Sequence, residues 1–169
     1  VNQTLIMCPT GYNRSWTNDK FLRTLGSGLD KSIPVMWTGD TVVHDITLPG
    51  QKWVNERVQR PTFIWWNWPC NDFKRSRLSM GRTYGLDTAP EMKEQMSGFV
   101  ANPMEHAEAS KVGLFGVANY TWNIDDFESV TTWEAGLRRL YPRHREAMKV
   151  FCDHNSYLLP NGHGYFREE

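Results

Sequence analysis

The sequence predicts an α/β fold of parallel strands and helices, and more specifically one half of a (β/α)8 barrel. Four short apolar runs begin about thirty residues apart, which is the repeat expected of βα units. Near-continuous hydrophobicity is typical of strands buried on both faces of a parallel sheet. A complete barrel takes about 250 residues, so a chain of 169 residues has room for four units and not for eight. The four predicted strands span residues 4–9, 33–38, 62–67 and 97–102.

The segments between and after these runs have helical patterns. The first begins with Asp19, a residue type that caps helix starts, and stops at Gly26. The second ends before Pro61, and Pro142 separates the last two. Residues 69–89 follow neither pattern and are expected to form a long loop, a kind of segment that is usually functional or disordered. The predicted helices span residues 19–25, 53–58, 105–122, 127–141 and 143–154.

Composition and charge argue against several classes of function. Lys plus Arg equals Asp plus Glu at 19 each, so nothing favours binding to nucleic acid or to an anionic membrane. No apolar run approaches the ~20 residues that span a bilayer. Cys8, Cys70 and Cys152 are too scattered for a disulfide scaffold or a zinc ribbon. Because no phosphate-binding or dinucleotide-binding loop is present either, we expect neither a cofactor nor a metal.

Three groups of titratable residues have structural explanations beside catalytic ones. The adjacent pair Asp125 and Asp126 has the composition of a glycosidase or protease carboxylate pair, but between two helices Asp more often caps a helix start. Residues 105–108 include two glutamates and a histidine, at a spacing that matches no established zinc motif. His44 beside Asp45 is a further possible dyad on a loop. We favour the structural explanation for each group.

Polar residues follow the ends of the predicted strands. Active sites in parallel α/β folds collect at the carboxyl ends of strands, so these residues predict one rim that could hold a sugar. An ionised Asp72 would accept strong hydrogen bonds from two sugar hydroxyls, although an ordinary Asx turn is the other explanation for this residue. An Asn supplies both a donor and an acceptor, which suits a hydroxyl or an amide. The rim residues are Tyr12, Thr38, Asp40, Asn67, Asp72 and Asn102.

Three motifs resemble those of family 84 glycoside hydrolases, the β-N-acetylglucosaminidases that include the O-GlcNAc-removing enzymes and proteins called hyaluronidases. They are Met36-Trp37-Thr38-Gly39-Asp40, Ile64-Trp65-Trp66-Asn67-Trp68-Pro69 with Asp72, and Asn102-Pro103-Met104-Glu105-His106-Ala107-Glu108. The similarity runs almost from end to end, in order and at matching spacing. Cys8-Pro9-Thr10 with Tyr12-Asn13, and residues 160–165, are most similar to bacterial members.

The resemblance implies that residues 1–142 are strands five to eight of a catalytic (β/α)8 barrel, and that residues 143–169 lead towards a following helical domain. It also implies substrate-assisted retention, in which the acetamido oxygen of the substrate attacks the anomeric carbon and forms an oxazoline. In the family an Asp pair after the fourth strand polarises the acetamido group and exchanges the proton. That pair would lie upstream of Val1, so this chain would hold no catalytic residue and would be inactive alone.

The resemblance assigns an acetamido pocket to Tyr12, Thr38 and Trp65, with Val42 at its edge. Apolar walls would hold the methyl group, and hydroxyls would fix the carbonyl in a near-attack pose. Gly11 departs from the family pattern, in which we expect Glu, and is expected to loosen the loop that carries Tyr12.

The resemblance assigns the rest of the sugar to three further residues. Asp72 would bind the outer hydroxyls, those at C4 and C6, and Asn102 would bind a ring hydroxyl. Asn67 would position either the acetamido group or the catalytic acid.

The partners implied are a carbohydrate or glycoprotein that contains N-acetylglucosamine and the missing N-terminal half of the barrel. Bacterial members suggest a secreted or periplasmic protein. A non-catalytic N-acetylglucosamine-binding or scaffold protein is the alternative function. A half barrel leaves open edges near Leu5 and Val100, so we expect the isolated chain to aggregate or to pair with a second copy.

Overall fold

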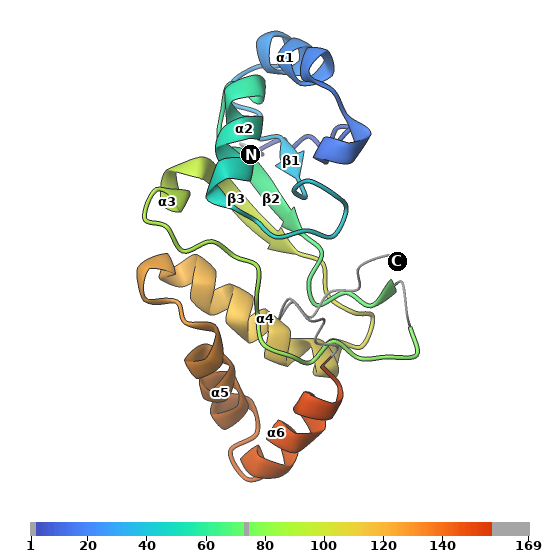
Figure 1. The fold of residues 1–169 in the computed structure, drawn as a ribbon, viewed down its shortest axis with the longest axis vertical. Helices are drawn as coiled ribbons and strands as arrows, with labels where there is room; N and C mark the ends of the chain where they lie inside the picture. Colours follow the sequence, from blue (N-terminus) through green and yellow to red (C-terminus); the bar gives the residue numbers. More distant parts are fainter. Residues whose placement is uncertain (1–2, 73–74, 157–169) are drawn as a thin grey trace. The chain divides into compact units, whose positions relative to one another are not determined.

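The computed structural model describes residues 3–72 and 75–156, which divide between two compact units (Figure 1). Of the described residues, unit 1 comprises 3–66 and 86–100, and unit 2 comprises 67–72, 75–85 and 101–156. Unit 1 holds a small sheet and its helices, whereas unit 2 is largely helical. The α/β class is therefore confirmed, and a partial barrel is consistent with this order of elements.

The sheet has the strand order β1 (Met36–Trp37), β2 (Thr62–Trp66) and β3 (Met96–Ala101). β1 and β2 are parallel, with Met36 opposite Phe63 and Trp37 opposite Ile64. Figure 1 shows the arrows of β2 and β3 pointing the same way. Three of the four predicted strands therefore form, at positions close to those that the apolar runs predict.

The first run, residues 4–9, forms a single parallel bridge between Met7 and Val35 instead of a strand. Continuing the ladder in either direction would need an N–H from Pro34 or from Pro9, and proline has none. The prediction of a strand buried on both faces is wrong here, because Leu5 is 65% exposed. At the other predicted edge, Val100 is 38% exposed.

The helices of unit 1 begin and end at residues other than those predicted. α1 (Asp19–Gly28) is capped by Asn18, whose side chain accepts from the Phe21 N–H, so the predicted cap at Asp19 is wrong. The helix also continues past Gly26, because this glycine lies against α2 and does not form a C-cap. α2 (Leu48–Val58) starts five residues earlier than predicted, after a Thr47 cap. The sequence pattern missed the short α3 (Met92–Gln95).

The core of unit 1 lies between its first two helices and the sheet. Leu22 of α1, Val54 and Val58 of α2, and Trp37 of β1 form one buried cluster, with Trp53 packed against it. The apolar face predicted for residues 53–58 therefore does face the core. Thr38 directly follows β1, so this packing fixes the position of a predicted site residue.

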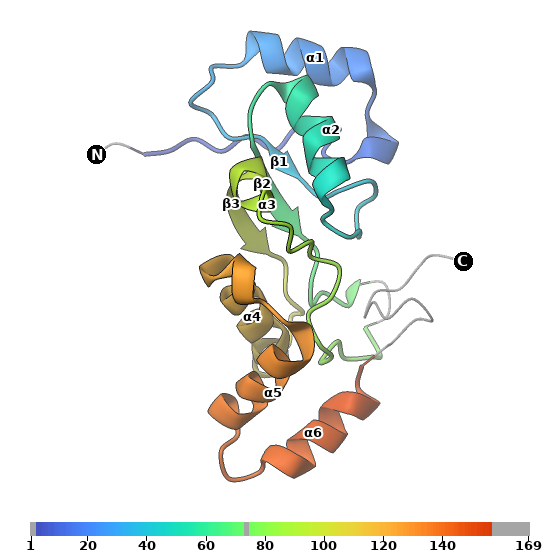
Figure 2. The same cartoon turned by 60° about the vertical axis from the view of Figure 1, so that its left-hand side comes forward.

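Unit 2 consists of α4 (Ala107–Trp122), the short η3 turn (Ile124–Asp126), α5 (Ser129–Leu140) and α6 (Arg145–His154). α4 packs against α5, and α5 packs against α6 (Figure 2). All three long helices begin two residues later than predicted, and the boundary predicted after residue 142 separates two helices of the same unit.

The core of unit 2 also includes residues of the predicted loop. Trp133 donates its indole N–H to the Met80 carbonyl oxygen at 3.1 Å. In its described part, residues 69–72 and 75–89, the loop contains turns and one isolated bridge, which confirms the prediction of an irregular segment. The buried members of the core are Met80, Met104, Val112, Trp133, Leu137 and Cys152.

Two glycines of α1 provide a matched test of how closely the first two helices pack. A Cβ added at Gly26 would lie 2.5 Å from the Arg57 carbonyl oxygen, whereas one at Gly28 would meet nothing within 4 Å. We predict that Gly26→Ala lowers the free energy of unfolding by about 1–3 kcal/mol through overpacking. Gly28→Ala should leave it unchanged or slightly higher. Urea denaturation of both variants checks this, and equal effects would contradict it.

Candidate functional site

Unit 1 brings together the residues predicted to form a pocket. The Thr38 N–H donates to the Tyr12 carbonyl oxygen at 3.0 Å, which places Tyr12 beside the end of β1. The rings of Tyr12 and Trp65 lie 5.2 Å apart between centroids and are tilted by 33°. Thr38 is buried, and its hydroxyl donates to the Thr41 carbonyl oxygen at 2.9 Å. Val42 is half-buried in the loop that follows. An aromatic pair thus lies beside a buried threonine.

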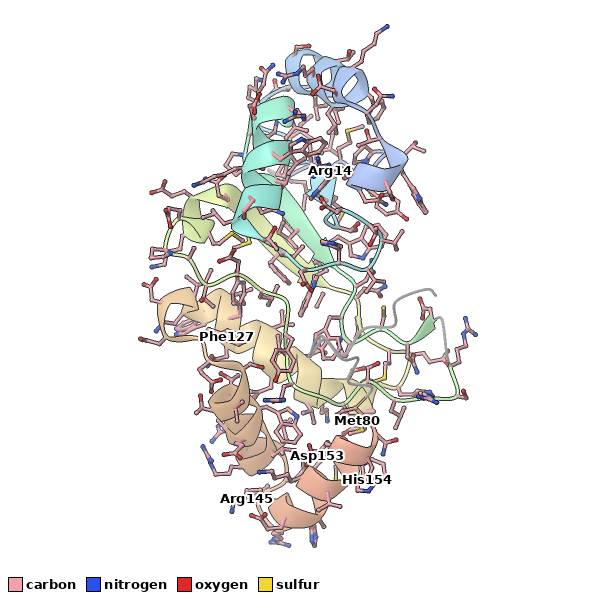
Figure 3. The ribbon with its side chains drawn as sticks, in the orientation of Figure 1. Arg14, Met80, Phe127, Arg145, Asp153 and His154 are labelled. Carbon is pink, nitrogen blue, oxygen red and sulfur yellow. The ribbon has the colours of Figure 1, made fainter. Side chains whose placement is uncertain are left out.

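The loop that carries Tyr12 is closed by hydrogen bonds. Buried Asn13 accepts at Oδ1 from the Trp16 N–H and the Ser15 hydroxyl, which caps the short η1 turn (Arg14–Trp16). The N–H groups of Arg14 and Ser15 donate to the carbonyl oxygens of residues 39 and 40 at 3.1 and 3.0 Å. Figure 3 labels Arg14 between this turn and α2. Two loops that carry predicted pocket residues are therefore joined through their backbones.

Two glycines are needed for this arrangement. A Cβ at Gly11 would lie 2.9 Å from the Cβ and Oγ1 of Thr17, so the absence of a side chain lets the loop close. The loosening that we expected from Gly11 is therefore not what the structure shows. Gly39 has a φ of 110°, a conformation that L side chains rarely adopt.

Unit 2 holds the other three predicted residues. Asn67 is 5% exposed, and its Oδ1 accepts from the Asn102 Nδ2 at 2.9 Å. This bond turns the Oδ1 of Asn102 away from Asn67. Asp72 is exposed, within a loop that is tied by a bond from the Asn71 Nδ2 to the Arg77 carbonyl oxygen at 2.6 Å. The two asparagines therefore form a direct pair, and Asp72 presents its carboxylate to solvent.

Cys70 lies beside Asp72 and has a perturbed thiol. Burial raises the pKa of Cys70 to about 11, and the negative charge of Asp72 contributes in the same direction. The thiol donates to the Asn67 carbonyl oxygen at 3.3 Å. A protonated thiol with this bond acts in packing and has little nucleophilic character.

The remaining candidate groups make local contacts. Asp126 lies in η3 and accepts from the Asn123 side chain at 2.6 Å, while Glu128 caps α5, so the prediction that the Asp pair caps this helix is wrong. The Nδ1 atom of His44 lies 2.9 Å from the backbone carbonyl oxygen of Asp45. His106 and Glu105 are exposed and 3.9 Å apart.

Among the described residues, no three His, Cys, Asp or Glu side chains lie together in a way that could hold a metal ion. Within the same ranges, 3–72 and 75–156, none of the helices combines the length and apolarity of a membrane span.

Sequence reasoning missed the residues that support Tyr12. Asn13 has a recognisable signal, because an Asn before a short turn often caps it. The guanidinium of Arg14 lies 4.4 Å from the centroid of the Trp53 ring, and no sequence spacing predicts that contact. Trp53 is therefore a support for the pocket loops as well as a member of the core.

Unit 1 is an α/β unit with aromatic and hydroxyl groups at the carboxyl ends of parallel strands, which is where active sites of parallel α/β folds collect. The family model described as β-N-acetylglucosaminidase matches residues 1–153. The chain belongs to this family of glycoside hydrolases, and the resemblance to family 84 is confirmed.

Named relatives agree with this assignment. The proteins called Protein O-GlcNAcase of Rattus norvegicus and Mus musculus are each 32% identical over 126 residues, which cover 71% of this chain and 13% of theirs. The structure of CpGH84B has a TM-score of 0.83 and 32% identity, covering 89% of this chain and 28% of that one. An O-GlcNAc hydrolase mutant of Thermobaculum terrenum has a TM-score of 0.83 and 33% identity, covering 93% and 34%. The chain thus spans a small part of the curated relatives it matches.

The thiol of Cys70 gives a pH-dependent prediction. At pH 8 a thiol with a pKa near 9 is about 10% ionised and one with a pKa near 11 about 0.1%, so native Cys70 should react with iodoacetamide at least about a hundredfold more slowly than in the urea-unfolded protein. Peptide mapping by mass spectrometry measures this rate. Asp72→Asn removes a nearby negative charge and should lower the pKa of Cys70, moving its alkylation profile towards lower pH. Equal native and unfolded rates would contradict the assignment.

Proposed function

We propose that this chain is the sugar-binding part of a retaining exo-β-N-acetylglucosaminidase that hydrolyses terminal β-linked N-acetylglucosamine, of the O-GlcNAc or glycan type. The observation that carries the proposal is the Tyr12–Trp65 aromatic pair beside buried Thr38. This combination suits an acetamido group, which has an apolar methyl and a polar amide. The family and the names of its relatives support the same substrate class.

The acetamido pocket has a direct role in the proposed reaction. The rings of Tyr12 and Trp65 supply apolar walls, and Val42 completes the edge. With the methyl group held there, the carbonyl oxygen of the substrate stays close to the anomeric carbon and attacks it to give an oxazoline. Water then opens the oxazoline with retention of configuration. The contribution of this pocket is to orient the nucleophile, because the nucleophile belongs to the substrate.

The sugar hydroxyls are the proposed ligands of unit 2. Asp72 has an exposed carboxylate that can accept from the hydroxyls at C4 and C6 through charge-assisted hydrogen bonds. Asn102, oriented by its bond to Asn67, is proposed to bind a ring hydroxyl. Asn67, which accepts the hydrogen bond from Asn102, is proposed to position either the acetamido group or the catalytic acid.

The catalytic acid and base are proposed to be contributed from outside these 169 residues. The sequence contains one pair of adjacent aspartates, Asp125 and Asp126. Both are exposed in η3, which follows a helix, whereas the family pair follows a strand. The exposed apolar side chains of Leu5 and Val100 are suitable for packing against further barrel strands. The missing N-terminal half of the barrel is the partner proposed to supply these strands together with the catalytic acid and base.

The proposal is tested by replacing Asp72 in the full-length protein. We predict that Asp72→Ala lowers kcat/KM on an aryl N-acetyl-β-glucosaminide by about a hundredfold or more, since losing a charged hydrogen bond shielded by bound sugar costs roughly 3 kcal/mol. Steady-state hydrolysis measures this effect. The matched control is Asp126→Ala, which removes another exposed aspartate and should change kcat/KM less than threefold.

Three outcomes would contradict parts of the proposal. A loss below about threefold for Asp72→Ala would return Asp72 to the role of an ordinary turn residue. A large loss for Asp126→Ala would place catalysis in η3. Binding of N-acetylglucosamine without any hydrolysis by the full-length protein would indicate the non-catalytic sugar-binding alternative.

A further inference from the structure

A groove runs between α5 and α6 of unit 2. It consists of a hollow of about 170 Å³ and a second hollow of about 210 Å³, which share Glu134 and Lys149 as lining residues. Figure 3 shows Arg145 and Asp153 on the side of α6 that faces α5. The described residues that line the two hollows include none of those assigned to the sugar. We call the two hollows together the α5–α6 groove.

Positive charge is concentrated at one end of the α5–α6 groove. Residues 138–149 contain five of the 19 Lys and Arg side chains of the chain and one of its 19 acidic side chains. Three of these cations line the first hollow, and the other two lie exposed around the turn that joins the helices. Because the chain as a whole is neutral, this end of the groove is a local positive patch. The five cations are Arg138, Arg139, Arg143, Arg145 and Lys149.

Internal ion pairs neutralise part of this charge. Lys149 donates to the Glu134 carboxylate at 2.8 Å, and Arg145 pairs with Glu146. Lys149 also holds the pKa of the Glu134 carboxyl below its usual value, and the charges of Arg138 and Arg145 act in the same direction. A carboxylate is therefore stabilised at this position. Within the described residues, the arginines of the patch that make no hydrogen bond or ion pair are Arg138, Arg139 and Arg143.

Helix stability accounts for some of these cations and not for others. Arg138 and Arg139 lie in the last turn of α5, where the helix dipole favours positive charge. Arg143 and Arg145 lie just before and at the start of α6, where the helix dipole disfavours it. An anion bound beside the turn would relieve this repulsion.

We propose that the α5–α6 groove binds the carboxylate groups of an acidic polysaccharide, at a site separate from the one that holds N-acetylglucosamine. The choice of a carbohydrate partner rests on the proposed function. Guanidinium groups bind carboxylates through two parallel hydrogen bonds, and a groove of two joined hollows suits an extended chain.

Other polyanions fit this patch less well. Residues 138–149 have no exposed aromatic ring on which a nucleic-acid base could stack, since Tyr141 is half-buried. The same residues have no exposed large apolar side chain that could enter a membrane. An acidic polysaccharide needs neither feature.

The test measures the binding of polygalacturonate, a carboxylated polysaccharide without N-acetylglucosamine, to the full-length protein by isothermal titration calorimetry. We predict saturable binding at low salt that weakens as salt screens the charges. Replacing Arg138, Arg139 and Arg143 together by Gln should raise Kd about tenfold, since each exposed charge pair contributes about 1.5- to 5-fold.

The matched control replaces Lys20, Lys52 and Lys93 together by Gln, which removes the same charge from exposed side chains of unit 1. It should change Kd less than twofold. Neither triple variant should change kcat/KM on a neutral aryl N-acetyl-β-glucosaminide, which also shows that both are folded.

The outcomes separate this inference from a general effect of charge and from the proposed function. Equal weakening by both triple variants would overturn the inference, because net charge and not the groove would then hold the polysaccharide. Absence of binding, or tighter binding of single-stranded RNA or of anionic vesicles, would overturn it as well. A wild-type protein that binds polygalacturonate through the three arginines but hydrolyses no aryl substrate would support the inference and overturn the proposed function.

Discussion

The rest of unit 1 depends on the hydrogen bonds that the buried guanidinium of Arg60 donates to backbone carbonyl oxygens. Arg60 is 8% exposed, and its nitrogens donate to five backbone carbonyls at 2.5–3.1 Å. These carbonyls lie at the end of α1, in the turn before β1 and at the end of α2, and belong to Gly26, Leu29, Asp30, Ile33 and Val58. Oxygens at helix ends carry partial negative charge, so a cation there is favourable and compensates for its own burial. Removing Arg60 would take a donor from all five carbonyls, although Gly26 would still accept from the Lys31 ammonium and Asp30 from the Ile33 N–H.

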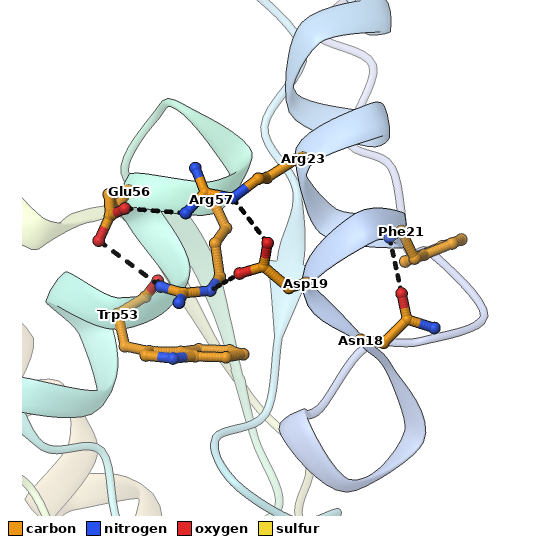
Figure 4. Close-up of polar contacts among 7 residues, drawn as sticks. All are labelled: Asn18, Asp19, Phe21, Arg23, Trp53, Glu56 and Arg57. Carbon is orange, nitrogen blue, oxygen red and sulfur yellow. Dashed lines mark hydrogen bonds and ion pairs between the residues drawn. The ribbon is translucent and has the colours of Figure 1, made fainter.

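The ion pairs between α1 and α2 contribute less to the stability of unit 1 than Arg60 does. Asp19, Arg23, Glu56 and Arg57 form a connected network on the surface of α1 and α2 (Figure 4). Exposed pairs of this kind contribute about 0–1 kcal/mol each, because water and salt screen them. Arg60 acts inside, where hydrogen bonds are stronger and their loss is more costly. The surface network therefore orients the Trp53 support, while Arg60 and the apolar core hold the elements together.

The sequence predicts those elements for which local pattern and tertiary environment agree. β2 forms where predicted because Thr62–Trp66 is both strongly apolar and flanked by strands on both sides. The run at residues 4–9 is equally apolar, but Pro9 and Pro34 leave the ladder without donors at the next positions, so one bridge remains. The observed helix starts differ from the predicted ones for a related reason. Asn18 and Asp19 are both good caps by residue type, and the hydrogen bond that decides between them is visible only in three dimensions.

In the candidate site, the residues proposed to contact the sugar were predictable from the sequence, whereas the residues that support them were not. Tyr12 and Thr38 are predictable because they follow or end apolar runs, whereas Trp65 is assigned by the family resemblance. The structure brings the three together. The role of Gly11 could not be predicted from the sequence, because it depends on how close Thr17, six residues later, would lie to a Cβ at this position. Arg14 and Trp53 lie 39 residues apart and have no shared period. Their contact exists because the packing of α2 presents an indole ring to the Tyr12 loop. A pocket that orients a nucleophile belonging to its substrate depends on such supports, because any change in the position of its walls changes the geometry of attack.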